Sequence, residues 1–111
     1  MERPDLSIAV QRSDAEAVLT LAGEIDMSTA GELATTVGEL LAGGRVPPRI
    51  LLDLADVTFC DSQGLGTLVV LSRKAAMTHS CLVLVNVGDF LLRVLDITGL
   101  RDALMIQQGA A

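Results

Sequence analysis

The chain has 111 residues, half of them hydrophobic, which is enough for one domain with one core. Fourteen Asp and Glu against eight Lys and Arg give a net charge of −6. That sign disfavours nucleic acid and anionic membrane surfaces as partners. Residues 1–5 are charged where an export signal needs an apolar run, and no stretch is apolar enough to cross a bilayer. We therefore expect a single domain over residues 1–111 that is cytoplasmic and a monomer when alone.

The first half of the chain predicts a hairpin followed by a helix. Alternating Leu6, Ile8 and Val10 predict a strand, and the apolar segment 17–22 predicts its antiparallel partner. A helical stripe within residues 29–41 follows, formed by Leu33, Ala34, Val37, Leu40 and Leu41. We expect Ser28 or Thr29 to cap this helix and Gly43-Gly44 to end it.

The second half alternates strands and helices. Residues 49–54 and 81–87 read as buried strands, and residues 104–106 as a last short one. Between the first two lies a helical stripe made of Leu65, Leu68, Val69, Ser72 and Ala76. A third helix is expected over 90–97, closed by Thr98-Gly99. The order β-β-α-β-α-β-α-β predicts an α/β fold with a mixed, mostly parallel sheet of about four to five strands, an N-terminal hairpin and three helices.

The candidate site is the segment 59–66, at the junction of a buried strand and a helix. The carboxyl edge of the strands in an open α/β sheet is the usual place for a functional site. Asp61 or Ser62 is expected to cap the helix. Gly64 and Gly66 weaken the helix by about 1 kcal/mol each, and we expect them to allow a close backbone approach.

Enzymatic readings of this segment fail. Ser62 and Gly64 match half of a G-x-S-x-G nucleophile motif, but Cys60 stands where the first glycine is needed. The single histidine, His79, comes seventeen residues later on the same predicted helix, about 25 Å away, and cannot activate Ser62. Cys60 and Cys81 lie far apart without a CxxC pair, so we expect small buried hydrophobes rather than metal ligands or a disulfide. The sequence predicts no enzyme, cofactor or metal, but a binding or switching module.

Three motifs carry a family resemblance. Gly23-Glu24-Ile25-Asp26, the run 61–66 (DSQGLG) and the run 96–100 (DITGL) resemble the signatures of STAS-domain anti-sigma factor antagonists, and the resemblance covers about residues 6–107. It implies the STAS fold. It also implies that Ser62 is phosphorylated by an anti-sigma factor that is itself a serine kinase. The unphosphorylated chain would bind that kinase and release a sigma factor, and a serine/threonine phosphatase would reset the switch.

The sequence departs from the family pattern at two places. Gln63 replaces the usual Ser or Thr, which leaves Ser62 as the acceptor in the loop. Residues 107–111 leave room for only a short C-terminal helix, or none. The partner surface is expected at Asp26, Asp61, Ser62, Gln63, Gly64, Leu65, Gly66, Phe90 and Leu92.

Some of these roles stay open. Asp26 either caps the first helix or shapes the partner surface. Leu92 falls on the polar side of its helix, where it is either a partner contact or a scattered surface residue. A phosphate on Ser62 would sit at a helix N-terminus, which favours anions, so we expect the fold to survive and the partner surface to change. The alternative function is a constitutive STAS scaffold or small-ligand module without phosphorylation.

Overall fold

A computed structural model describes residues 6–107. Its elements are β1 (Leu6–Arg12), β2 (Glu16–Ile25), α1 (Ala30–Ala42), β3 (Arg49–Cys60), α2 (Ser62–Met77), β4 (Cys81–Val85), α3 (Asp89–Thr98), the 3₁₀ helix η1 (Leu100–Ala103) and β5 (Met105–Gln107). The predicted order is confirmed, with η1 as an addition. The expectations about an export signal and a C-terminal helix concern residues 1–5 and 108–111, which lie outside the described residues.

The five strands form one sheet in the order β1-β2-β3-β4-β5. β1 and β2 are the expected antiparallel hairpin, with Leu6 opposite Gly23 and Arg12 opposite Ala17. All later pairs are parallel. Helical crossovers join β2 to β3 and β3 to β4, as parallel neighbours require. The carboxyl ends of β2, β3 and β4 therefore meet at one edge of the sheet.

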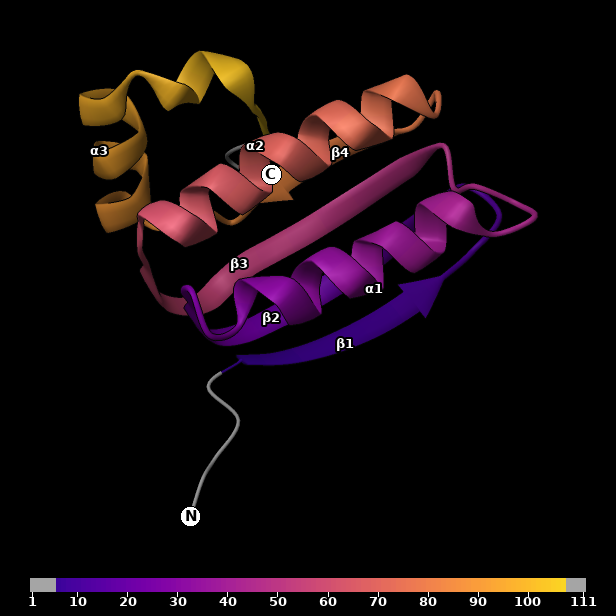
Figure 1. Cartoon of the computed structure of the whole chain (residues 1–111), viewed down its shortest axis with the longest axis horizontal. Coiled ribbons are helices and arrows are strands. Elements are labelled where there is room, and N and C mark those ends of the chain that lie inside the picture. Colours follow the sequence, from indigo (N-terminus) through magenta and orange to yellow (C-terminus); the bar gives the residue numbers. More distant parts are fainter. Residues whose placement is uncertain (1–5, 108–111) are drawn as a thin grey trace.

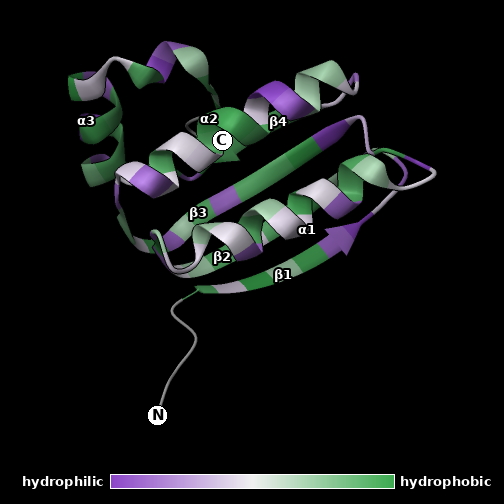
Figure 2. Cartoon of the chain, viewed as in Figure 1, coloured by the Kyte–Doolittle hydropathy of each residue, from purple (hydrophilic) through white to green (hydrophobic). Residues whose placement is uncertain are grey.

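α1 and α2 lie side by side across one face of the sheet, and α3 stands near the start of α2 (Figure 1). Alternate residues of the central strands point into the space under the helices, among them Leu19, Ile50, Leu52 and Leu84, all fully buried or nearly so. The first half of β3 is largely hydrophobic (Figure 2). Burial of this aliphatic core at about 25 cal/mol per Å² is the main force that holds the layers together.

The predicted strand 49–54 is too short, because β3 continues to Cys60. Its second half pairs with the end of β2, from Ala22 opposite Asp56 to Ile25 opposite Cys60, with two register shifts at each of which β3 carries one residue more than β2. Asp56 and Thr58 of this half are exposed and interrupt the apolar pattern, so the sequence places the end of the strand too early, at Leu54. The strand 81–87 is in turn too long, since Asn86 takes a left-handed conformation (φ 56°) after Val85.

The predicted buried face of α2 is wrong in its second half. Leu71 and Ala75 are buried, whereas Ser72 is partly exposed and Ala76 is exposed. Both stripes are compatible with a period of 3.6 residues, and packing of α2 against α1 and β4 selects the one that carries Leu71. The helix also ends at Met77, so His79 lies in the turn after it rather than on it.

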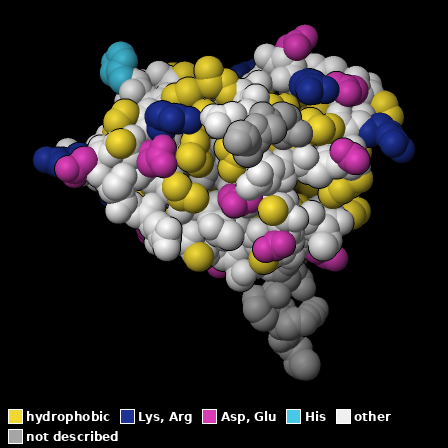
Figure 3. Space-filling view, turned by 180° about the vertical axis from the view of Figure 1, so that it is seen from behind, with side chains coloured by type: hydrophobic (Ala, Val, Ile, Leu, Met, Phe, Trp, Pro, Cys, Tyr) yellow, Lys and Arg dark blue, Asp and Glu magenta, His cyan; other side chains and the backbone are white. Residues whose placement is uncertain are grey.

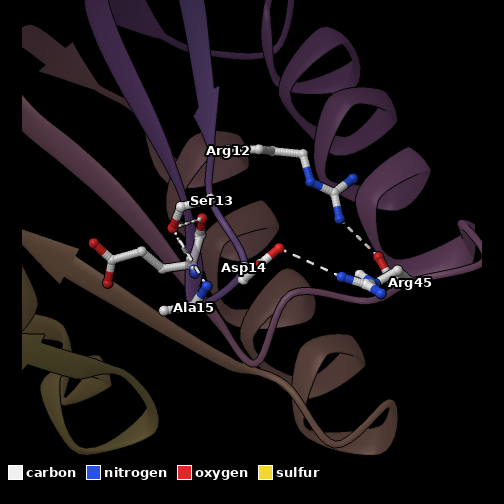
Figure 4. Close-up of polar contacts among 6 residues, drawn as sticks. Arg12, Ser13, Asp14, Ala15 and Arg45 are labelled. Carbon is white, nitrogen blue, oxygen red and sulfur yellow. Dashed lines mark hydrogen bonds and ion pairs between the residues drawn. The ribbon is translucent and has the colours of Figure 1, made fainter.

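At the amino ends of β2 and β3, polar contacts join the hairpin turn to the loop after α1 (Figure 4). The Ser13 hydroxyl accepts the N–H of Glu16 at 3.3 Å, which closes the turn. Arg45 pairs with Asp14 at 3.4 Å, and the Arg12 guanidinium donates to the Arg45 carbonyl at 2.7 Å. This cluster lies at the opposite edge of the sheet from the segment 59–66.

Seen from behind, hydrophobic side chains are interspersed with charged ones (Figure 3). Val18, Leu51 and Val83 form one apolar row of the sheet, in register across β2, β3 and β4. The Arg49 guanidinium pairs with Glu16 at 3.7 Å and donates to Gln107 at 3.4 Å. In the described part of the chain, no helix has the length and apolar character needed to span a membrane.

Candidate functional site

The segment 59–66 forms a tight junction between β3 and α2. Asp61 is the N-cap of α2, in extended conformation, and its Oδ1 accepts the N–H of Gly64 at 2.8 Å. Of the two residues expected to cap α2, Asp61 is therefore the one that does so. Ser62 is the first helical residue and is exposed. Its hydroxyl is presented to solvent at the positive end of the helix dipole.

Asp61 also ties the junction to the turn between β2 and α1. Its Oδ2 accepts the N–H of Met27 at 3.2 Å, and its own N–H donates to the Ile25 carbonyl at 3.1 Å. The Asp61 carboxylate thus joins the start of α2 to a turn 34 residues earlier in the chain. The sequence indicated only that both segments end at the same sheet edge.

Asp26 organises the β2–α1 turn. Its Oδ1 accepts from the Ser28 N–H at 2.9 Å, the Ser28 hydroxyl at 2.8 Å and the Thr29 N–H at 3.2 Å. The Ser28 hydroxyl is the main reason that the pKa of Asp26 lies below its ordinary value of 3.8. Asp26 therefore caps the turn that leads into α1, four residues before the helix begins at Ala30.

The expected cap of α1 by Ser28 or Thr29 is wrong. Thr29 occupies the N-cap position, but its side chain makes no capping hydrogen bond to the helix. The Thr29 hydroxyl instead donates to the Glu24 carbonyl at 2.8 Å and accepts the Asp26 N–H at 2.9 Å. It is buried, and it closes the same turn from the inside.

The two glycines of the motif differ. A Cβ on Gly64 would lie 2.4 Å from the Ile25 carbonyl oxygen and 2.9 Å from the Cys60 Sγ, so the expected close approach is confirmed there. A Cβ on Gly66 would meet nothing within 4 Å, so the expectation is wrong for Gly66. Gly64 and Leu65 are buried and cannot offer a side chain to a partner, whereas Gln63 is exposed beside Ser62.

The two cysteines differ in burial. Burial, and then the nearby charge of Asp61, raise the pKa of the Cys60 thiol to about 12, so Cys60 behaves as the expected small hydrophobe. Cys81 is partly exposed, and its thiol contacts the Met105 sulfur at 3.0 Å, which differs from the expected burial. Among residues 6–107, no group of three or more His, Cys, Asp or Glu side chains is placed to hold a metal ion.

The third helix presents Phe90 but not Leu92. Phe90, in the first turn of α3, is 40% exposed. Leu92 packs partly against the core, so the expectation of an exposed Leu92 is wrong. Leu91 and Leu95 form the buried stripe, and Leu92 lies on its flank rather than opposite it. Ile97, at 77%, is more exposed than Phe90.

The sequence reasoning missed one residue of the site. Met27 lies in the β2–α1 turn, is 75% exposed, and is held beside the start of α2 by the Asp61 carboxylate. An apolar residue between Asp26 and Ser28 in a turn was the available signal. The carboxyl edge thus brings together Asp26, Met27, Asp61, Ser62 and Gln63.

Comparisons with known proteins agree with this architecture. Residues 8–107 match the family described as Mlab, STAS domain. The anti-sigma-B factor antagonist of Listeria monocytogenes is 36% identical over 106 residues, which cover 93% of this chain and 90% of the relative. The crystal structure of an anti-sigma factor antagonist from Mycobacterium paratuberculosis superposes with a TM-score of 0.78 at 30% identity, over 96% of this chain and 89% of that one.

The fold is also shared with SpoIIAA of Bacillus, an anti-sigma factor antagonist. Its phosphorylated form superposes with a TM-score of 0.73 at 17% identity, over 94% of this chain and 92% of that one. The sheet order, the helices and the whole-chain similarity therefore agree, and the chain belongs to the STAS-domain family of anti-sigma factor antagonists.

Proposed function

We propose that the chain binds an anti-sigma factor and thereby releases a sigma factor, and that phosphorylation of Ser62 switches this binding off. The observation that carries the proposal is the position of Ser62: an exposed hydroxyl on the first residue of α2, next to an aspartate whose two oxygens are already engaged. Relatives with 30% identity or more over nearly the whole chain are named as antagonists of anti-sigma factors.

A phosphate fits this position without disturbing the fold. It adds about −1.5 to −2 charges at a helix N-terminus, where the helix dipole favours an anion. The cost arises when a partner covers the site, because a dianion beside Asp61 would lose its water and face a like charge. Moving a complex from 99% to 1% bound requires about 5.5 kcal/mol of differential affinity, which an unpaired buried phosphate can supply.

The roles of the partners follow from this scheme. The anti-sigma factor acts as the serine kinase and brings the ATP, and a serine/threonine phosphatase restores the binding form. Ser62 is a substrate group rather than a nucleophile of this chain, so the chain itself works as a ligand and not as an enzyme. Such an exchange of partners with a sigma factor takes place in the bacterial cytoplasm.

The experiment is the intact mass of the purified chain after incubation with ATP and the anti-sigma factor kinase of the same genome. We expect one added phosphate on the parent, none on Ser62→Ala, and one on Ser28→Ala, which removes the neighbouring exposed hydroxyl. The phosphorylated chain should keep its helical circular dichroism and lose its complex with the kinase in gel filtration. If the parent stays unmodified while Ser62→Ala binds as the parent does, the chain is a constitutive binding module.

A further inference from the structure

α1 and α2 leave a groove between them. One hollow of about 270 Å³ is lined by Ala34 of α1 and by Gln63, Gly66 and Val70 of α2. A second hollow of about 400 Å³ is lined by Gly38 and Ala42 of α1 and by Met77 of α2. Lys74 lines both, so the two hollows are successive parts of one depression, here named the α1–α2 groove.

Two glycines keep this groove open. Gly38 and Gly66 lie inside helices, where glycine is unfavourable relative to alanine. A Cβ at either position would meet nothing within 4 Å, and neither has a positive φ. Neither close packing nor backbone conformation therefore requires a glycine. The absence of side chains at Gly38 and Gly66 leaves space in the groove.

The groove combines exposed apolar side chains with one positive charge. Val70 is 46% exposed and Met77 is 82% exposed, both on the groove side of α2. Lys74 is the charged residue among those that line the two hollows in the described chain, although the protein as a whole carries −6. An occupant that matches these features is apolar and carries a carboxylate for Lys74.

We propose that the α1–α2 groove receives an apolar segment of the anti-sigma factor, with an acidic side chain opposite Lys74. The inference rests on the proposed function and extends it to a second contact. Gln63, the neighbour of Ser62, lines the groove, so a partner that covers Ser62 continues into the groove without a gap. Binding then has two parts, of which the Ser62 end senses phosphate and the groove supplies contact area in either state.

The test is the affinity of the unphosphorylated chain for the purified anti-sigma factor kinase, measured by calorimetry. Gly38→Leu fills the hollow farther from Ser62 and should weaken binding by about tenfold or more. The matched control is Thr35→Leu, which adds the same side chain to an exposed position of α1 that lines neither hollow. It should stay within about twofold of the parent, and circular dichroism should show both variants folded.

A charge reversal supplies a second, independent test. Lys74→Glu should also weaken binding by about tenfold, whereas Lys74→Arg keeps the positive charge and should retain most of the parent's affinity. Binding of both Gly38→Leu and Lys74→Glu within about twofold of the parent would overturn the groove proposal, while release of the partner by Ser62 phosphorylation would leave the proposed function standing. A parent chain that does not bind the kinase overturns both.

One rival occupant is a second copy of the chain. Light scattering of the parent and of Gly38→Leu distinguishes it from the anti-sigma factor. A monomer in both cases, together with the weakened heterocomplex, supports the proposal. A parent dimer that Gly38→Leu dissociates would assign the groove to self-association and overturn it.

Discussion

At the scale of single residues, Gly64 carries the tightest steric requirement of the site. An added methyl would press on the Ile25 carbonyl oxygen, 2.4 Å away, which belongs to the backbone and cannot rotate aside. We expect Gly64→Ala to lower the free energy of unfolding by about 3 kcal/mol, at the upper end of typical overpacking. Urea denaturation measures this difference directly.

The matched control for Gly64 lies two residues along the same helix. A methyl on Gly66 meets nothing within 4 Å, so only the helix propensity changes. Gly66→Ala should raise the free energy of unfolding by about 0.5 to 1 kcal/mol. Equal effects of the two substitutions would contradict the steric account of Gly64.

Asp26 predicts a pH dependence with a definite sign. Hydrogen bonds from Ser28 and Thr29 lower its pKa below 3.8 in the folded state, so the ionised form stabilises the fold. That contribution is complete above the unfolded-state value and is lost as the pH falls through the folded-state value. The stability difference between the parent and Asp26→Asn should therefore be constant from neutral pH down to about 4 and should shrink in more acidic buffer.

The comparison that tests this point is a series of urea melts of both proteins between neutral pH and the acid limit of folding. A difference that grows on acidification would mean that the Asp26 carboxylate is destabilising in the folded state. The hydrogen bonds to Asp26 from the Ser28 hydroxyl and the two backbone N–H groups would then not stabilise the folded state.

At the scale of elements, the start of α2 and the β2–α1 turn depend on Asp61. Its two oxygens hold the Gly64 and Met27 N–H groups, so Asp61→Ala removes a helix cap and a tertiary hydrogen bond together. We expect a loss of about 2 kcal/mol, the sum of a typical cap and one net hydrogen bond. Asp61→Asn keeps a capping oxygen and should lose about half as much.

Thermal melts followed by circular dichroism measure both variants, and amide exchange locates the effect. Exchange at Met27 should speed up in Asp61→Ala along with the first turn of α2, because one side chain serves both segments. Faster exchange confined to α2 would show that the contact with Met27 is not maintained in solution.

The elements also show how far local sequence patterns reach. Alternation and the helical stripes predicted every strand and helix except η1, since burying one face imposes a period of 2 or 3.6. The length of β3 could not be predicted, because Asp56 and Thr58 interrupt the apolar pattern beyond Leu54. Only the pairing with β2 shows that the strand continues. The buried face of α2 could not be predicted either, because its packing against α1 and β4 decides between Leu71 and Ser72.

The candidate site divides in the same way. Local motifs predicted Ser62 and the Asp61 cap, because a cap depends only on residues nearby in sequence. Met27 and the inward turn of the Thr29 side chain depend on segments joined through the fold. Leu92 was misplaced because an amphipathic pattern gives the centre of a buried stripe better than its flanks.

At the scale of the whole molecule, the two edges of the sheet have different roles. The carboxyl edge carries Ser62 with Asp26, Met27 and Asp61, and the α1–α2 groove begins there at Gln63 and runs along the helices to Met77. The amino edge carries the hairpin turn and the loop after α1, joined by the pair of Asp14 and Arg45 (Figure 4). A partner that covers Ser62 and the α1–α2 groove would leave this ion pair free, because neither Asp14 nor Arg45 lines the groove.

This difference between the two edges predicts the outcome of a double substitution at the amino edge. Asp14→Ser with Arg45→Ser removes the ion pair and leaves the net charge at −6, so long-range attraction to a partner is unchanged. Because the two side chains are 99% and 78% exposed, water and salt already screen their 3.4 Å contact. The free energy of unfolding should change by about 0.5 kcal/mol or less.

The same double variant should bind the anti-sigma factor kinase as the parent does and should accept one phosphate on Ser62. Calorimetry and intact mass measure the two properties on one preparation. The interaction surface of this fold would then consist of the Ser62 region and the α1–α2 groove, with the hairpin turn free to vary in charge. If the double variant lost binding while remaining folded, the partner would also have to contact the hairpin turn, and a docking mode confined to Ser62 and the α1–α2 groove would be excluded.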